Sequence, residues 1–484
     1  MNIEHDGPVG QEGKDNRESP AAQDPEPEKE PPYDVSTELG AEIQRIRQAF
    51  ANPKEPKEQK GLKRPKEPRK PAYIGVEWRK KNKDLDFLYQ KGHILVRDAY
   101  IARVRGVLGG GAVVDGLIDG VSLYSIAKAK NTSGAIHALN LIDEALGVGV
   151  AAPNYVLWAT AAASPDIGHL CPATDPEPVS AGSGPNPGEC PGRDGSGVRI
   201  HVPDTGLLDD ASTHPWLIGV TGDPDPQLGP AGTEPRIEPY CGHGTFIAGV
   251  ARCMAPLSDV HVASLLKFAG TELESEIVKH LDRELDQHPD IISLSAGTTT
   301  WRNHPPLAMQ ALWRRYRHYK GLLLVAAASN NGNRRPFWPA AFPQVVSVGA
   351  LSSNWRSRAS FSDYGGWVDV YAPGENLVNA FATGNYETCW SPNFGANAQT
   401  REFNGMARWS GTSFSTPLVA GLIAARMSRT GENSRQAADT LLAQARAQAL
   451  PGVGPVLYPC DSGPDCHCRT EERCDRCHHC HERR

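Results

Sequence analysis

The sequence predicts an α/β fold: a doubly wound, mostly parallel sheet with helices on both faces, preceded by a small α/β module. Two observations carry this prediction. From residue 198 to about residue 450, short apolar segments alternate with glycine-bounded segments of helical spacing, the pattern of repeated βαβ units. In residues 71–158, strand-like segments are separated by two helical segments, which suits a small α/β sandwich.

The composition excludes several classes of protein. The 484 residues include 50 Lys and Arg against 56 Asp and Glu, a net charge of −6, so nucleic acid is not expected as a partner. No apolar run approaches the ~18 residues that a membrane span needs. The N-terminus lacks the basic and apolar stretches of a secretory signal, so we expect a cytoplasmic location. Composition leaves the oligomeric state open.

Residues 1–70 are expected to form a disordered, charged arm. They are poor in apolar residues and rich in Pro, Glu and Lys, so they bury too little surface to offset their chain entropy. Acids concentrate in residues 1–40 and bases in residues 41–70. Two interpretations stay open: a solvated tail, or an arm that docks on an acidic surface. Residues 36–51, with Ser36 as a cap, have the pattern of one short helix.

Residues 71–158 are the first globular segment. Residues 159–197, rich in Pro, Gly and Ser, follow it and are expected to form a linker. The expected elements of the module are a strand at 93–98, a helix at 99–108, a strand at 120–127, a capped amphipathic helix at 132–146 and a strand at 148–157.

Three short motifs stand out in the large domain, residues 198–450. They are VRIHVPDTG, which holds Asp204, CGHGTFIAGV, which holds His243, and WSGTSFSTP, which holds Ser413. Each places its polar residue beside glycine at the end of an apolar element, and such ends carry the sites of α/β sheets. Taken singly, each residue has a structural alternative: an Asp that caps a turn, a structural His, and a helix-capping Ser.

Together the three residues suit nucleophilic catalysis. A serine hydroxyl is a poor nucleophile unless a base lies within hydrogen-bond reach, and that base needs a carboxylate to orient it. The order Asp204, His243, Ser413 supplies one residue for each role.

These motifs resemble the three signatures of the subtilisin-like serine proteases, the subtilase or peptidase S8 family. Further segments resemble family elements in the same order, and the match runs from residue 198 to about residue 430. The segments are PDIISLSAG at 289–297, LVAAASNNG at 324–332, WPAAFPQVVSVGA at 338–350, ASFSDYG at 359–365 and VYAPG at 370–374.

The resemblance implies a role for each matching residue. Ser413 would be the nucleophile, His243 the general base and acid, and Asp204 the residue that orients His243. Asn330 and the backbone N–H of Ser413 would form the oxyanion hole. The substrate-binding residues would be Ser295, Ala296 and Gly297, which would pair with an extended peptide or protein substrate.

Two departures from the family pattern concern cofactors and the cleft. Many relatives carry a calcium-binding loop inside the helix after the His motif, whereas residues 248–262 run through without an insertion, so that calcium site is in doubt. No cofactor is expected to be required for catalysis. The long stretch 377–408 either borders the cleft and restricts substrates or covers the surface.

Residues 71–158 resemble the N-terminal prodomain of the family, which assists folding and blocks the cleft until it is cut away. The alternative is a permanently attached accessory domain. If the segment is a prodomain, we expect cleavage between about residues 158 and 198 in the wild type and none in Ser413→Ala.

The tail, residues 451–484, ends in six cysteines and four histidines. Thiolates and imidazoles at such short spacing suit tetrahedral zinc, for example through Cys466, Cys468, Cys474 and Cys477. The alternatives are a disordered thiol-rich tail or a small disulfide knot, and an iron–sulfur cluster is less favoured.

The sequence therefore predicts a serine endopeptidase that acts through an acyl-enzyme. Two alternatives from other classes stay open: a non-catalytic peptide-binding or scaffold protein that kept the fold, and a metal or redox module carried by the Cys/His tail.

Overall fold

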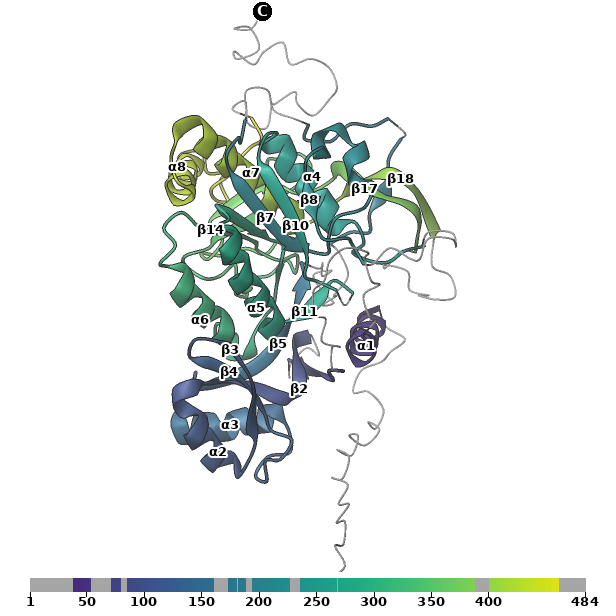
Figure 1. Ribbon diagram of the computed structural model, residues 1–484. Helices are drawn as coiled ribbons and strands as arrows, with labels where there is room; N and C mark the ends of the chain where they lie inside the picture. The colour runs from purple at the N-terminus through teal and green to yellow at the C-terminus, as the bar shows by residue number, and fades with distance from the viewer. Residues whose placement is uncertain are drawn as a thin grey trace, which may run out of the picture.

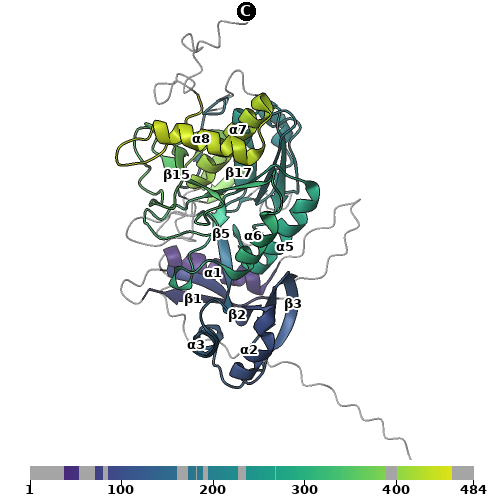
Figure 2. The ribbon, with the colours of Figure 1, turned by 90° about the vertical axis from the view of Figure 1, so that its left-hand side faces the viewer.

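The computed structural model describes residues 38–53, 71–79, 85–160, 173–180, 182–188, 194–226, 236–267, 269–387 and 400–460. The N-terminal module and the larger domain lie at opposite ends of the molecule (Figures 1 and 2). No helix in these ranges is both long and apolar enough to cross a bilayer. The predicted tail ligands Cys466, Cys468, Cys474 and Cys477 lie outside the described residues.

A seven-stranded parallel sheet forms the centre of the larger domain. Its strand order is β16-β15-β14-β12-β7-β10-β8, and every neighbouring pair is parallel. The prediction of a mostly parallel sheet is confirmed. The strands are β7 (Arg199–Asp204), β8 (Thr221–Gly222), β10 (Asp259–Ser264), β12 (Ile291–Leu294), β14 (Leu323–Ala327), β15 (Val346–Leu351) and β16 (Val370–Pro373).

Helices cover both faces of this sheet because its strands are apolar on both sides. Ile291 and Leu323 belong to the core on one face, whereas their neighbours Ile292 and Leu324 belong to the core on the other. The first face packs on α4 (His243–Met254), α7 (Thr412–Thr430) and α8 (Ser434–Ala447), and the second on α5 (Glu274–Glu284) and α6 (Leu307–Tyr316).

The N-terminal module is an antiparallel sheet between two pairs of helices. One face packs on its own helices α2 and α3, and the other packs on α5 and α6 of the larger domain. The predicted helices and strands of the module are present, with two further strands, β1 and β3. The strand expected at 93–98 begins eight residues earlier, and the helix expected at 132–146 begins at Ala135 without the predicted side-chain cap. The elements are β1 (Ile74–Trp78), β2 (Leu85–Arg97), α2 (Ile101–Leu108), β3 (Ala112–Ile118), β4 (Val121–Ser125), α3 (Ala135–Leu146) and β5 (Ala151–Ala159).

The predicted helix in the arm is present as α1 (Glu38–Ala51), whereas its expected cap, Ser36, lies outside the described residues. The expectation of disorder is wrong for residues 38–53. An apolar stripe on α1 shares one buried cluster with Trp158 and Phe337. The spacing of the stripe puts it on one helix face, and tertiary packing then stabilises a helix that would be marginal alone. The stripe consists of Leu39, Ile43, Ile46 and Phe50.

Two predicted boundaries also shift. Strand β5 continues through Ala159, so the linker does not begin there. The tail begins later than residue 451, because Leu457 N–H donates to Tyr371 O and Tyr371 N–H donates to Pro455 O, both at 2.9 Å. Val456 is fully buried beside β16, so apolar side chains hold this segment on the domain.

A second, four-stranded sheet has the order β6-β18-β17-β9. The hairpin of β17 and β18 corresponds to the long stretch 377–408, and its bulky side chains Phe381, Phe403 and Trp409 are buried. The strands are β6 (Glu177–Pro178), β9 (Arg236–Ile237), β17 (Leu377–Glu387) and β18 (Thr400–Trp409).

Candidate active site

The three candidate catalytic residues come from element ends at the carboxyl edge of the central sheet. Asp204 is the last residue of β7, His243 the first of α4, and Ser413 the second of α7. All three side chains are buried. The structure therefore brings together residues that are 39 and 170 positions apart in the sequence, counted from 204 to 243 and from 243 to 413.

A carboxylate orients the imidazole. His243 Nδ1 lies 2.7 Å from Asp204 Oδ1, and a carboxylate oxygen can only accept, so Nδ1 carries the proton and Nε2 is left as the basic nitrogen. The same Asp204 oxygen accepts the N–H of Thr205 at 2.8 Å. Gly242 precedes His243 with φ 77°, a left-handed conformation that favours glycine, and thereby lets α4 begin at the histidine.

Aromatic rings enclose the His243 imidazole. The ring centroids of Trp409, Phe414 and Tyr240 lie 5.4, 5.5 and 6.0 Å from it. Trp409 ends the β17–β18 hairpin, so at its C-terminal end the stretch 377–408 leads directly to the site. This packing limits water around the imidazole and holds its orientation.

The Ser413 hydroxyl meets the end of the N-terminal module. Ser413 Oγ shares a hydrogen bond with Thr160 Oγ1, the hydroxyl of the residue after β5. Within the described ranges, Ser413 and His243 do not share a hydrogen bond. Thr160 therefore occupies the position in front of the candidate nucleophile.

The Asn330 amide lies against the carbonyl of the same residue. Asn330 Nδ2 donates to Thr160 O at 2.7 Å, while Asn330 Oδ1 accepts the N–H of Thr412 at 2.8 Å. The second bond fixes which end of the amide points at the carbonyl. Asn330 follows β14 and is fully buried, so its donor acts where charge interactions are strong.

The predicted substrate-binding residues hold an extended strand. Thr160 N–H donates to Ser295 O at 3.0 Å, and β5 pairs antiparallel with β13 (Ala296–Gly297). On its other edge, β5 pairs with β11 (Thr271–Leu273), and Ala159 N–H donates to Gly270 O at 2.8 Å. The strand that reaches Ser413 is thus paired on both edges, as in β-strand addition of a peptide.

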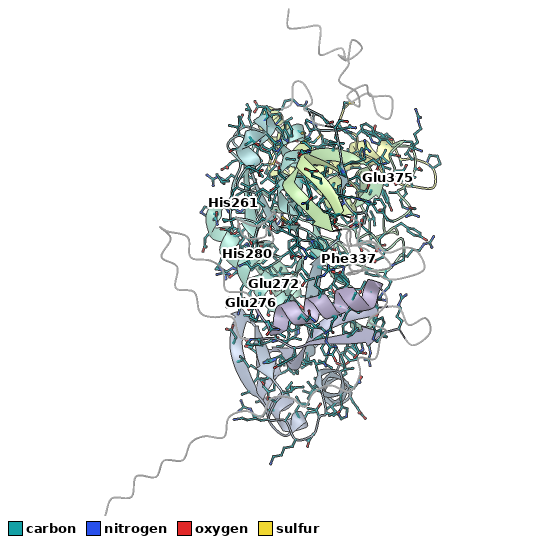
Figure 3. The ribbon with its side chains drawn as sticks, turned by 90° about the vertical axis from the view of Figure 1, so that its right-hand side faces the viewer. His261, Glu272, Glu276, His280, Phe337 and Glu375 are labelled. Carbon is teal, nitrogen blue, oxygen red and sulfur yellow. The ribbon has the colours of Figure 1, made fainter. Side chains whose placement is uncertain are left out.

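Helix α1 lies over this strand. Figure 3 shows α1 beside the labelled residues Glu272 and Phe337. The Trp158 ring, two residues before Thr160, lies 6.0 Å from the Phe337 ring within the cluster that the apolar face of α1 completes. Glu42 on α1 is buried as well and pairs with Arg45 at 3.0 Å.

Sequence reasoning missed Thr160, β11 and the acid Asp225. Thr160 and β11 join the site only through long-range strand pairing, which carries no local motif. Asp225 is buried and accepts hydrogen bonds from Thr205 Oγ1 and Gly242 N–H. Asp225 stands with Asp223 in a loop rich in Pro and Gly, where acids are typical turn residues, so no sequence signal indicated it.

The cysteines near the site are inert thiols. Cys241 and Cys253 are buried and form no disulfide with a described residue. Burial, with the nearby Asp225 carboxylate, raises the pKa of the Cys241 thiol well above its ordinary value. Cys241 is therefore protonated at neutral pH and does not compete with Ser413 as a nucleophile. Among the described side chains, no group of three or more His, Cys, Asp or Glu is placed to hold a metal ion.

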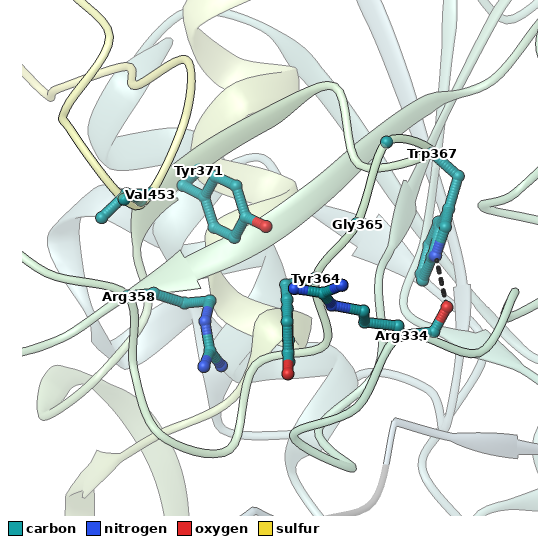
Figure 4. Close-up of a pocket in the computed structure, with 9 residues that line it drawn as sticks. Arg334, Arg358, Tyr364, Gly365, Trp367, Tyr371 and Val453 are labelled. Carbon is teal, nitrogen blue, oxygen red and sulfur yellow. Dashed lines mark hydrogen bonds between the residues drawn. The ribbon is translucent and has the colours of Figure 1, made fainter.

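A separate hollow of about 540 Å³ is lined by Arg334, Arg358, Tyr364, Trp367 and Tyr371, among others (Figure 4). The Arg358 and Arg334 guanidinium carbons lie 4.3 and 5.0 Å from the centroid of the Tyr364 ring. The residues that line this hollow include no Asp or Glu and neither Ser413 nor His243, so we assign no reaction to the hollow.

Comparison with known proteins identifies the family of the larger domain. The model of the subtilase family, peptidase S8, matches residues 195–454. Thermitase from Thermoactinomyces vulgaris is 30% identical over 264 residues, which cover 50% of this chain and 80% of thermitase. A thermophilic serine proteinase from Bacillus sp. (strain AK1) is 33% identical over 261 residues, which cover 49% of this chain and 54% of that proteinase.

The fold has a solved counterpart. Fervidolysin from Fervidobacterium pennivorans, a keratinolytic enzyme related to subtilisin, matches with a TM-score of 0.50 and 19% identity over 79% of this chain and 61% of fervidolysin. With the parallel sheet and the family match on residues 195–454, the chain belongs to the subtilase family of serine-type endopeptidases and has its subtilisin-like α/β fold.

Proposed function

We propose that this protein hydrolyses internal peptide bonds through Ser413, His243 and Asp204. The observation that carries the proposal is the placement of Thr160: its carbonyl oxygen lies on the Asn330 amide and its side chain on the Ser413 hydroxyl. A peptide held in this way presents its carbonyl carbon to the nucleophile.

The proposed reaction proceeds through an acyl-enzyme. His243 Nε2 takes the proton of Ser413 as Oγ bonds to the carbonyl carbon, and Asp204 stabilises the imidazolium that forms. Asn330 Nδ2 and the Ser413 N–H stabilise the oxyanion. His243 then protonates the leaving amine, and a water molecule releases the acyl group by the reverse sequence of proton transfers.

We further propose that residues 38–160 are an inhibitory prodomain whose scissile bond is Thr160–Ala161. Strand β5 occupies the place of a substrate between β11 and β13, which supports this assignment. The module packs on α5 and α6 and α1 lies over Trp158, so the strand is held from two sides. A permanently attached accessory domain is the alternative.

A fluorophosphonate probe tests the proposed reaction, because it labels only an activated serine. We expect labelling of the processed wild type and none of Ser413→Ala. Ser415→Ala is the matched control, since Ser415 is buried two residues away in the same helix and its hydroxyl has no hydrogen-bond partner among the described residues. Failure of the processed wild type to label would favour a non-catalytic peptide-binding protein.

A further inference from the structure

A third buried carboxylate joins the two loops that carry Asp204 and His243. Asp225 Oδ2 accepts the hydroxyl of Thr205 at 2.9 Å and the N–H of Gly242 at 2.8 Å. Thr205 follows Asp204, and Gly242 precedes His243. One oxygen atom therefore bridges the backbone neighbours of both residues.

The Thr205 hydroxyl completes the link on the other side of His243. It accepts the N–H of Gly244 at 3.1 Å while it donates to Asp225. Both residues that flank His243 are thus tied to the Asp204 loop. These bonds hold the first turn of α4, and with it the imidazole, at a fixed position relative to the Asp204 carboxylate.

The segment that presents Asp225 is itself tightly seated. Leu207 N–H donates to Asp223 O at 2.8 Å, and Asp225 N–H donates to Leu207 O at 3.0 Å. A β-carbon on Gly206 would come within 2.7 Å of Pro224 O, so the two backbones are in close contact. Asp225 is only 7% exposed, which leaves its carboxylate little freedom to move.

The chemistry of this position requires an acceptor. Two donors converge on one buried oxygen, and a hydrogen bond to a charged acceptor is shorter and stronger than one to a neutral acceptor. If the acceptor is removed, both donors lose their partner in a buried setting, and the two loops are free to move apart.

We infer that Asp225 is a positioning residue for the reaction of Ser413. It acts through Thr205 and Gly242 on the distance and angle between Asp204 and His243, and it does not touch the substrate. The inference rests on the proposed function, since it concerns the geometry of that same site.

Two variants of Asp225 test the inference through their separate effects on kcat and KM for a peptide substrate. Asp225→Ala should lower kcat roughly 10²-fold, the size expected when a reacting group moves by about 1 Å. KM should stay within about twofold, because the strands that bind substrate are untouched. Asp225→Asn should recover most of kcat, since its carbonyl oxygen can accept both bonds.

The pair Thr205→Val and Thr205→Ser gives a second test that does not depend on the folding of Asp225→Ala. Thr205→Val should lower kcat as Asp225→Ala does, whereas Thr205→Ser keeps the hydroxyl and should keep the rate. The double variant Thr205→Val with Asp225→Ala should lose no more than the worse single variant, because both break one link.

The inference is overturned if Asp225→Ala keeps the kcat of the wild type, or if Asp225→Asn is as slow as Asp225→Ala. Losses of kcat that add up in the double variant would also overturn it. Fluorophosphonate labelling separates the two claims. A wild type that does not label contradicts the proposed function, whereas a wild type that labels beside an unimpaired Asp225→Ala contradicts this inference alone.

Discussion

The side-chain amide of Asn330 donates a hydrogen bond of 2.7 Å to the carbonyl oxygen of Thr160. These residues are 170 positions apart in the chain, counted from 160 to 330. The bond marks the point where the N-terminal module meets the chemistry of the larger domain. The acceptor carbonyl also belongs to Thr160–Ala161, the peptide bond that the protein is proposed to cleave in itself.

Self-cleavage is expected between Thr160 and Ala161. Intact-mass and N-terminal analysis of purified wild type should give a new N-terminus at Ala161, while Ser413→Ala should remain full length. Thr160→Pro removes the N–H that donates to Ser295 O and should slow processing. Equal full-length mass for wild type and Ser413→Ala would contradict the prodomain assignment.

Asn330→Ala is expected to impair the chemical step. Its kcat on a peptide substrate should fall by roughly 10²–10³, the loss measured in a subtilisin, a relative, when one such donor is removed. KM should change little. Asn331→Ala is the control, because the Asn331 amide donates to Ser329 Oγ. Equal kcat for the wild type and Asn330→Ala would remove Asn330 from the oxyanion hole.

Ile46→Ala is expected to loosen the prodomain after cleavage. Ile46 is fully buried on α1, and truncating such a side chain costs about 2–5 kcal/mol of packing. The lag between cleavage, followed on gels, and the appearance of peptidase activity should shorten. Gln48→Ala, at an exposed position of the same helix, should leave the lag unchanged. Equal lags for the two variants would mean that α1 takes no part in inhibition.

Glu274→Gln is expected to change how stability depends on pH. Burial raises the pKa of Glu274 from 4.5 to about 8, although it accepts hydrogen bonds from Ala308 N–H and Met309 N–H. A raised pKa means that folding favours the protonated acid, so this stability is present below about pH 4.5 and is lost as the pH rises toward about 8.

Thermal unfolding in the Ser413→Ala background measures this effect. The Tm of Glu274→Gln relative to its parent should rise as the pH increases from about 5 to about 8, the window between the two pKa values. A constant Tm difference would place the Glu274 pKa near its ordinary value.

Metal content tests the Cys/His tail, whose residues 461–484 lie outside the described ranges. If Cys466, Cys468, Cys474 and Cys477 bind zinc, the purified chain should hold stoichiometric metal that is lost when residues 460–484 are removed. Peptidase activity should survive the truncation, because no tail residue belongs to the proposed site. A metal content unchanged by truncation would exclude the tail as the ligand set.

The sequence alone was enough to predict the functional residues that lie in recognisable local motifs. Asp204, His243 and Ser413 each lie within two residues of a glycine, at the end of an apolar strand or the start of an apolar helix. Asn330 follows an apolar run, so the positions of all four residues could be predicted. The parallel sheet was predictable for the same reason, since strands buried on both faces give unbroken apolar runs.

Contacts that depend on tertiary packing could not be predicted in this way. Thr160 lies in an Ala- and Ser-rich stretch whose composition predicts a linker, and only strand pairing brings Thr160 to Ser413. The role inferred for Asp225 depends on hydrogen bonds from Thr205 and Gly242, which lie on two other loops. The apolar stripe of α1 was visible as a helix, but its partners Trp158 and Phe337 come from separate parts of the chain.

If β5 is the inhibitory strand proposed above, its attachment to the rest of the chain sets how inhibition depends on dilution. While Thr160 and Ala161 are joined, the strand meets the cleft at an effective concentration of ~mM, whatever the concentration of the protein. Once the bond is cut, the same contacts form a complex between two molecules, whose occupancy falls on dilution. Latency would therefore persist in a concentrated sample and end in a dilute one, so the assay concentration decides which state is observed.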